Sequence, residues 1–332
     1  MLHGRGAAAG LPGELDRAGA TRVALAASST LATRTGTISE LEHSLGSRHL
    51  LTFTGLGQHT PEAAVSTLAQ LLAQGQADAV VSVGGGSVID GCKAALHEAE
   101  LEAFHVAVPT TLSGAEFTPN AGVTDAATQQ KRSVVDRRTA PRVVLLDPLL
   151  SLATPERLWL GSGIRAVDHA VETVLSPVGD QLGHLLALKA LVRLRSALPA
   201  CRQDPLDLEA REQAQVAAWW AALGLASVPM GPSHSLGKLL GAPFGIAHGI
   251  TSCVLLPAVI AETARTDPDR AAALVGAFSV TGPDEVAGAC QRLITDLGLP
   301  TSLSAAGLAP TDLPTYLASI PPEWREVVRA TY

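Results

Sequence analysis

The sequence predicts an α/β fold in which a doubly wound parallel sheet occupies the first half and helices alone make up the second. Short apolar runs alternate with helix-like patterns over roughly the first 150 residues, whereas only helical patterns follow Pro155. A chain of 332 residues suffices for two domains. We therefore expect an α/β domain over residues 1–152 and a helical domain over residues 153–332. Their cores should be mainly aliphatic, because aromatic residues make up only 3% of the chain.

The predicted strands of the first half are short apolar runs that end at turn residues. They cover residues 22–27, 79–83, 105–108 and 142–146. One predicted helix spans residues 62–75, where apolar side chains recur at helical spacing, and another begins near Val88. Strands that alternate with helices in this way are typical of a parallel sheet that is covered on both faces.

The second half is expected to be helical almost throughout, because its apolar residues recur every three or four positions. The predicted helices span residues 163–175, 181–198, 207–226, 232–241, 248–264, 268–277 and 283–297.

The formal net charge of -7 bears on the partners of the protein. Nucleic acids and anionic membranes attract basic surfaces, so neither is expected as a partner, while a small anionic substrate is compatible with a local cationic pocket.

No uncharged apolar run is long enough to span a bilayer, and residues 1–6 lack the apolar core of a signal peptide. The four scattered cysteines are typical of buried free thiols. We expect a cytoplasmic protein.

Three consecutive glycines and a serine, Gly84, Gly85, Gly86 and Ser87, stand between a predicted strand and a predicted helix. Glycine lets the backbone approach a pyrophosphate, and the free N–H groups at a helix N-terminus attract anions. Ser87 can cap the helix or donate to a phosphate. A plain turn would require only one glycine, so the pattern favours a phosphate-binding turn, although it departs from the G-x-G-x-x-G pattern of ordinary Rossmann folds.

Two threonines follow the next predicted strand. Thr110 and Thr111 come directly after Pro109, at the carboxyl end where ligands of doubly wound sheets bind. Their hydroxyls can donate to a ligand there. Alone, the pair is equally consistent with a capped turn.

Taken together, these segments resemble the iron-dependent alcohol dehydrogenase superfamily. Residues 83–93 resemble its G-G-G-S-x-x-D-x-x-K signature, in which Asp90 is the acidic residue, and residues 109–116 resemble its P-T-T-x-x-x-x-E segment. The further matches are Asp147-Pro148 and residues 163–172, 234–238, 241 and 247–249. The resemblance runs along nearly the whole chain. It implies a nucleotide-binding domain, a helical domain with the site in the cleft between them, NADH or NADPH as cofactor, and a homodimer.

One substitution changes the metal site that the resemblance implies. The family holds its metal with one Asp and three His; the histidines correspond to His169, His234 and His248, but Arg165 stands where the Asp belongs. Residues four apart share a helix face, so Arg165 and His169 should point into one site. A guanidinium cannot ligate a metal. Its positive charge would also destabilise a neighbouring divalent cation by roughly several kcal/mol. Asp168 lies about 100° around the helix from His169 and should face another partner.

We therefore expect a cationic pocket without metal. Lys238 follows His234 by one turn, and together with Arg165 it would attract carboxylates. The resemblance is closest to maleylacetate reductases, which also lack the Asp, work without metal and reduce the activated C=C bond of a dicarboxylate. The leading hypothesis is thus an NAD(P)H-dependent oxidoreductase that reduces an unsaturated or keto carboxylate. Hydride would come from the nicotinamide and a proton from a histidine, His234 or His248.

The choice between the two nicotinamide cofactors depends on the end of the first strand. In the family, an acidic residue there repels the 2′-phosphate of NADPH; the matching position here is Ser28, with Arg34 nearby. We therefore expect NADPH to be tolerated and NADH to remain a substrate. The resemblance also places Asp90 and Lys131 in the cofactor site.

Several alternatives stay open. In one alternative Arg165 is only a structural bridge to Glu172 or Glu116. In a separate alternative His169, His234 and His248 are core histidines. If Arg165 swings away, the protein is an ordinary metal-dependent alcohol dehydrogenase. A third class is an inactive, regulatory or non-redox biosynthetic relative, against which the intact Gly-Gly-Gly-Ser turn argues.

Overall fold

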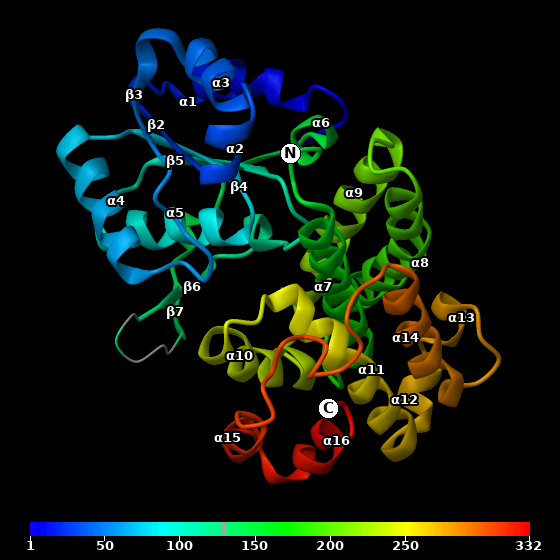
Figure 1. The fold of residues 1–332 in the computed structure, drawn as a ribbon. Coiled ribbons are helices and arrows are strands. Elements are labelled where there is room, and N and C mark those ends of the chain that lie inside the picture. Colours follow the sequence, from blue (N-terminus) through cyan, green and yellow to red (C-terminus); the bar gives the residue numbers. More distant parts are fainter. Residues whose placement is uncertain (126, 128–130) are drawn as a thin grey trace. The chain divides into compact units, whose positions relative to one another are not determined.

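The computed structural model describes residues 1–125, 127 and 131–332, and its chain folds as two compact units, Met1–Pro155 and Glu156–Tyr332 (Figure 1). The first unit contains a parallel sheet with helices, and the second unit is helical. This arrangement confirms the predicted fold class.

Six parallel strands form the sheet of the first unit. In sheet order they are β1 (Leu2–His3), β8 (Val143–Leu146), β5 (Phe104–Pro109), β4 (Ala79–Gly84), β2 (Val23–Ala27) and β3 (His49–Phe53). The chain runs from β2 outward to β3 and then crosses to β4 on the other side of β2, so the strand order reverses between β2 and β4. Ligands of doubly wound sheets bind at the carboxyl ends of the strands at such a point. Ser28 and Gly84 stand there.

The two faces of the sheet carry alternate residues of each strand. On one face Val23, Leu25 and Val81 pack with the helices α1 (Leu11–Ala18), α2 (Ser29–Arg34) and α3 (Thr37–Leu45). On the other face Ala24 and Val80 pack with α4 (Glu62–Gly75) and α5 (Gly86–Glu98). This period of two distributes a nearly continuous apolar run over two cores, as expected for a sheet buried on both sides (Figure 1).

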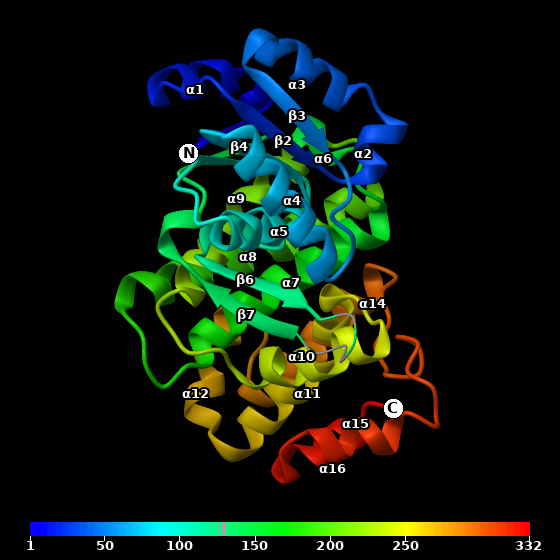
Figure 2. The same ribbon diagram turned by 90° about the vertical axis from the view of Figure 1, so that its left-hand side faces the viewer.

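Four strands escaped the sequence prediction. The strand β1 is only two residues long, and β3 is half-buried along its whole length, so neither shows a periodic pattern. The strands β6 (Asn120–Thr124) and β7 (Lys131–Val135) form a separate antiparallel hairpin, which Figure 2 shows beside α5. Each of these strands has only two apolar residues, Ala121 and Val123 in β6 and Val134 and Val135 in β7, which is too short a pattern to mark a strand in the sequence. A short helix, α6 (Pro148–Ser151), is capped by Asp147.

The second unit consists of helices, and residues 156–332, all of which the structure describes, contain no strand. The longer helices are α7 (Glu156–Leu175), α8 (Gln181–Gln203), α9 (Leu208–Leu225), α10 (Pro232–Phe244), α11 (His248–Thr266) and α14 (Val286–Asp296). Shorter ones are α12 (Pro268–Ala272), α13 (Val275–Phe278), α15 (Leu313–Ser319) and α16 (Arg325–Arg329).

The helix α7 is the core of this unit, because every residue from Trp159 to Leu175 is buried. It approaches α11 to backbone contact: a Cβ on Gly249 would lie 2.4 Å from the Gly161 carbonyl oxygen. A glycine is therefore required at position 249, and this close approach brings the start of α11 against α7.

The helix bounds of the second unit differ most from the sequence prediction at three places. The helix α7 begins at Glu156, not at residue 163. The helix α8 continues through Pro199 to Gln203, because Leu198 and Cys201 stay buried on the same helix and offset the single hydrogen bond that a proline removes. The predicted helix 268–277 is two short helices, α12 and α13.

All four cysteines are buried free thiols, as the sequence predicted. In the part of the chain that the structure describes, no helix is long and apolar enough to cross a membrane.

Candidate active site

The Gly-Gly-Gly-Ser turn joins β4 to α5 in the first unit. Gly84 is the last residue of β4, and Gly85 has extended backbone and precedes the first turn of α5. No side chain caps this helix, so the prediction that Ser87 caps it is wrong; Ser87 lies inside the first turn. No side chain therefore competes with a ligand for the N–H groups at the start of α5, an arrangement that suits a phosphate-binding turn.

The residues after β5 form a wall along this turn. A Cβ on Gly85 would lie 3.0 Å from Thr111 Cγ2, and one on Gly86 would lie 2.9 Å from Ser113 Oγ. Thr111 is 5% exposed, and its hydroxyl has no hydrogen-bond partner among the described residues. Thr110 donates its N–H to the Gly84 carbonyl (2.9 Å), which ties the two strand ends together. An unsatisfied buried hydroxyl beside a cradle with no side chains fits a bound phosphate group.

The structure places Ser28 beside the same turn. The Ser28 N–H donates to the Val83 carbonyl (3.2 Å), and its hydroxyl caps α2 by accepting from Leu31 N–H (3.3 Å). A Cβ on Gly84 would lie 3.5 Å from the Ser28 nitrogen. The position assigned to the cofactor ribose therefore adjoins the position assigned to its phosphates.

Asp90 and Lys131 both lie against Gly122 of β6. The Asp90 carboxylate accepts the Gly122 N–H (3.1 Å) and pairs with the Lys93 ammonium (2.9 Å). Lys131 lies over Gly122, where a Cβ would overlap its Cε. Lys93 has no role in the sequence prediction, although the signature motif includes it; a lysine with 0% exposure is the signal that only the structure provides.

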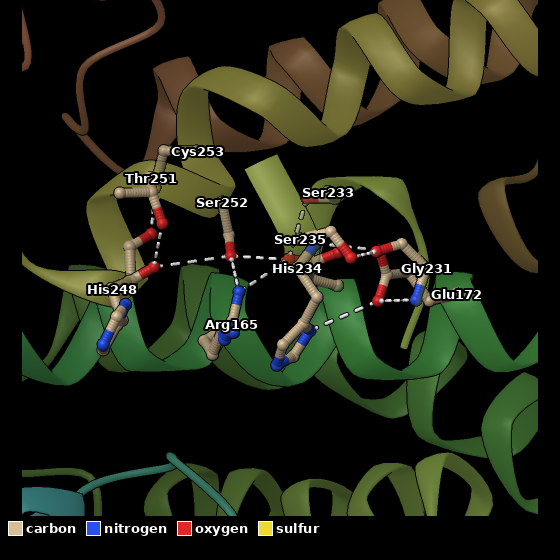
Figure 3. A network of polar contacts seen from close by, with 12 residues as sticks. Arg165, Glu172, Gly231, Ser233, His234, Ser235, His248, Thr251, Ser252 and Cys253 are labelled. Atoms are coloured by element: carbon tan, nitrogen blue, oxygen red, sulfur yellow. Dashed lines mark hydrogen bonds and ion pairs between the residues drawn. The ribbon is translucent and has the colours of Figure 1, made fainter. Parts of the chain in front are cut away.

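Arg165 stands at the centre of a buried polar network in the second unit (Figure 3). Its Nη1 donates to Asp168 Oδ2 (3.1 Å) and to Ser252 Oγ (2.9 Å), and the Ser252 hydroxyl donates to the same Asp168 oxygen (2.6 Å). The Ser233 hydroxyl donates a third hydrogen bond to Asp168 (3.0 Å). The hydrogen-bond partner of Arg165 is thus Asp168 rather than Glu172. Its Nη2 and Nε donate to no residue that the structure describes.

Glu172 contacts both the backbone and the ring of His234. One oxygen of Glu172 accepts the His234 backbone N–H (2.9 Å), and the other accepts the Gly231 N–H (3.1 Å) and lies 3.2 Å from His234 Nδ1. A Cβ on Gly231 would lie 2.6 Å from Glu172 Cδ, so only glycine admits this carboxylate. Because Nδ1 faces Glu172, the ring presents Nε2 away from it.

The three predicted histidines have different surroundings. His169 stacks on His234, with ring centroids 5.1 Å apart. Burial, His234 and Arg165 together hold the pKa of His169 well below its usual range, so His169 is neutral. Figure 3 shows the His248 and His234 rings extending to the same side of the network as Arg165, which stands between them.

Lys238 belongs to the same region of the second unit. It is half-buried on α10, and burial and the charge of Arg165 lower its pKa. Burial, opposed by Asp168 and Glu172, likewise lowers the pKa of Arg165. Two cations therefore lie close enough to act on one another, beside the carboxylates of Asp168 and Glu172, whose pKa values burial raises, that of Asp168 to about 7.

The comparisons with known proteins agree with this geometry. Residues 1–148 match iron-containing alcohol dehydrogenase, and residues 160–320 match the C-terminal part of the Fe-containing alcohol dehydrogenase family. Maleylacetate reductase of Rhizobium sp. (strain MTP-10005) is 31% identical over 329 residues, which are 98% of this chain and 90% of that protein. The chain belongs to the iron-containing alcohol dehydrogenase superfamily, in its maleylacetate reductase-like branch.

Further relatives support this membership. Maleylacetate reductase 2 of Cupriavidus pinatubonensis is 36% identical over 252 residues, covering 76% of this chain and 69% of its own. The crystal structure of maleylacetate reductase from Agrobacterium tumefaciens superposes with a TM-score of 0.89 at 27% identity, covering 100% of this chain and 95% of that chain. The chain is an NAD(P)H-dependent oxidoreductase, so the non-redox alternative loses its support.

The residues present do not fit the metal of the iron-containing alcohol dehydrogenases. Arg165 stands where the resemblance places an acidic ligand, and Asp168 and Ser252 anchor its guanidinium in the buried network. Within residues 1–125, 127 and 131–332, no group of three or more His, Cys, Asp or Glu side chains is arranged to hold a metal ion. Anchoring also makes it costly for Arg165 to swing away, because Asp168, with 0% side-chain exposure, would lose its cationic partner.

Proposed function

We propose that the protein is a metal-independent, NAD(P)H-dependent reductase of a small unsaturated or keto carboxylate, similar to maleylacetate reductase. The observation that carries this proposal is the anchored Arg165. Nη1 is bound to Asp168 and Ser252, so the guanidinium is held in one orientation and its Nη2 and Nε remain to donate to a substrate carboxylate. Two parallel donors suit a carboxylate better than any single cation does.

The first unit binds the cofactor in this proposal. The Gly84–Ser87 turn and the Thr110 and Thr111 hydroxyls hold its phosphates, and Ser28 adjoins the ribose. Asp90 and Lys131, which the resemblance also assigns to the cofactor site, both lie against Gly122 of β6. Because Ser28 carries no charge, it does not repel the 2′-phosphate of NADPH, and NADH remains a substrate.

The second unit binds and polarises the substrate. When bound, NAD(P)H supplies a hydride to an electrophilic carbon of the substrate. Arg165 and Lys238 hold the anionic groups and stabilise the negative charge that develops on the carbonyl oxygen as the electrons move there. They take the part that a metal plays in other members of the superfamily.

His234 delivers the proton that completes the reduction. Glu172 lies 3.2 Å from Nδ1 and fixes the ring, so Nε2 is the atom that holds the proton for the substrate. His169 is neutral and stacks on His234, which suits a positioning role. His248, on the other side of Arg165 in Figure 3, is the second candidate for the acid.

The test is a metal analysis of the purified protein together with NADH and NADPH oxidation over a panel of keto- and enoyl-dicarboxylates and simple aldehydes. We expect turnover of a dicarboxylate that is insensitive to chelators and independent of added zinc or iron. Stoichiometric metal in the active protein, with inactivation by chelators and turnover of aldehydes alone, would replace this proposal with a metal-dependent alcohol dehydrogenase.

A further inference from the structure

The ammonium of Lys93 is fully buried, with 0% side-chain exposure, in the middle of α5. Its Nζ donates to the carbonyl oxygens of Ala115 (2.9 Å), Thr118 (3.3 Å) and Asn120, and it pairs with Asp90 (2.9 Å). An ammonium has three protons, so these acceptors use all of them. Burying an ammonium is costly unless it is fully hydrogen-bonded, and the contacts of Lys93 offset that cost. Lys93 has no donor left for a ligand.

The carbonyl groups that Lys93 binds belong to residues 110–120, the segment that leads from the end of β5 to the first residue of β6. Only a single 3-10 turn, Ala115–Phe117, gives this segment regular structure. Its first residues include Thr111 and Ser113, the two side chains that wall the glycine turn. The shape of that wall therefore depends on contacts made further along the segment, and Lys93 supplies three of them.

Lys93 and the glycine turn stand on the same helix. The glycines form the N-terminus of α5, and Lys93 follows two turns later, with Asp90 between them. Asp90 extends the clamp to Gly122 by accepting its N–H (3.1 Å). Glu116 is buried within the same segment, with Oε2 unpartnered among the described residues; burial raises its pKa to about 7, and the nearby charge of Lys93 opposes this rise. The helix α5 thus carries the glycine turn at its N-terminus and, through Lys93, also binds the segment that contains Thr111 and Ser113.

We propose that Lys93 is a positioning residue of the cofactor site: by binding three carbonyl groups of residues 115–120 it fixes Thr111 and Ser113 at the distance from Gly85 and Gly86 that a pyrophosphate requires. Lys93 acts through the wall and does not touch the cofactor. This inference rests on the proposed placement of the NAD(P)H phosphates at the glycine turn.

The test compares Lys93→Met with Val65→Ala, a buried substitution in α4 whose side chain packs in the same core and lies outside the cofactor site. We expect Lys93→Met to weaken NADPH binding in a fluorescence titration by about tenfold or more, whereas Val65→Ala lowers the melting temperature and leaves the dissociation constant unchanged.

A double-mutant cycle with Thr111→Val adds a readout that a purely structural role would not move. If Lys93 acts through the wall, Thr111→Val costs less affinity in the Lys93→Met background than alone.

A measurement on the unmodified protein covers the case in which Lys93→Met does not fold. The clamp predicts that the amides of Thr118 and Gly122 are protected from hydrogen exchange before any cofactor is added. Free exchange of these amides without NADPH, or an unchanged NADPH dissociation constant in a folded Lys93→Met, would overturn the inference. If Gly85→Asp also leaves NADPH binding intact, the assignment of the phosphates to the glycine turn is wrong. If Gly85→Asp abolishes binding but Lys93→Met leaves it unchanged, the phosphate assignment stands and the positioning role of Lys93 is wrong.

Discussion

The two functional regions of this protein are built from different materials. The glycine turn of the first unit, the proposed phosphate site, acts through its backbone: Gly84, Gly85 and Gly86 carry no side chains, so a ligand there would meet N–H groups. The network of the second unit is a side-chain site, in which Arg165, Asp168 and Ser252 define one another by hydrogen bonds. A backbone site tolerates little change because any added atom fills it, whereas a side-chain site can acquire new chemistry by one substitution.

This difference explains why the first region keeps the superfamily signature while the second departs from it. In the proposed function the glycine turn accommodates the cofactor phosphates, whereas the charge that stabilises the substrate comes from a guanidinium rather than from a metal. Arg165 would be ineffective alone, since an unanchored buried cation is costly. Asp168, Ser233 and Ser252 provide the anchoring.

The largest effect is expected in the backbone site. Gly85→Asp should abolish NADPH binding, because its Cβ would lie 3.0 Å from Thr111 and its carboxylate would repel the phosphates. A fluorescence titration measures this. Gly13→Asp is the matched control, since a Cβ there meets no atom within 4 Å, and it should bind NADPH normally. Normal binding by Gly85→Asp would show that the phosphates lie elsewhere.

In the side-chain site, Arg165→Asp restores the ligand set of one Asp and three His. It should lower kcat/KM for the carboxylate by about 10²–10³, because a charge-assisted bidentate contact is lost, and it should gain measurable affinity for zinc or ferrous iron. Steady-state kinetics and a metal titration measure the two effects. Arg165→Lys keeps a charge but not the planar fork, and should retain part of the activity. Full carboxylate turnover in Arg165→Asp would contradict the proposed role.

The anchoring of Arg165 predicts a smaller effect at Ser252. Ser252→Ala removes the hydroxyl that accepts from Arg165 and donates to Asp168, and should raise KM for the carboxylate by about tenfold while kcat changes less. Ser233→Ala is the matched comparison, since Ser233 contacts Asp168 but not Arg165. Equal KM values for the two variants would mean that only the satisfaction of Asp168 matters.

The smallest effect tests the rim of the backbone site. Ser28→Asp should raise KM for NADPH by about tenfold, because a repulsion of about 1.4 kcal/mol suffices, and it should leave KM for NADH nearly unchanged. Parallel rate measurements with the two cofactors separate repulsion of the 2′-phosphate from a general loss of binding. An unchanged KM for NADPH would remove Ser28 from the ribose site.

The sequence alone determined the features that depend on short spacing. Short apolar runs that alternate with helical patterns predict the parallel sheet, and the consecutive glycines predict the turn at Gly84–Ser87, because runs and close backbone approach are local properties. The four-residue spacing of Arg165 and His169 predicts that both lie on one face of a helix, and the structure places them one turn apart in α7.

The tertiary structure alone decided which groups meet across the chain. The sequence predicted only that Asp168 faces another partner than His169. The structure identifies that partner as Arg165, because Ser233 and Ser252 come from α10 and α11 and hold the Asp168 carboxylate there. Lys93 looks like any helical lysine until residues 115–120 fold over it. Such pairings depend on how elements distant in sequence pack, as at Gly161 and Gly249, and hydrophobic periodicity says which face of a helix is buried but not what it is buried against.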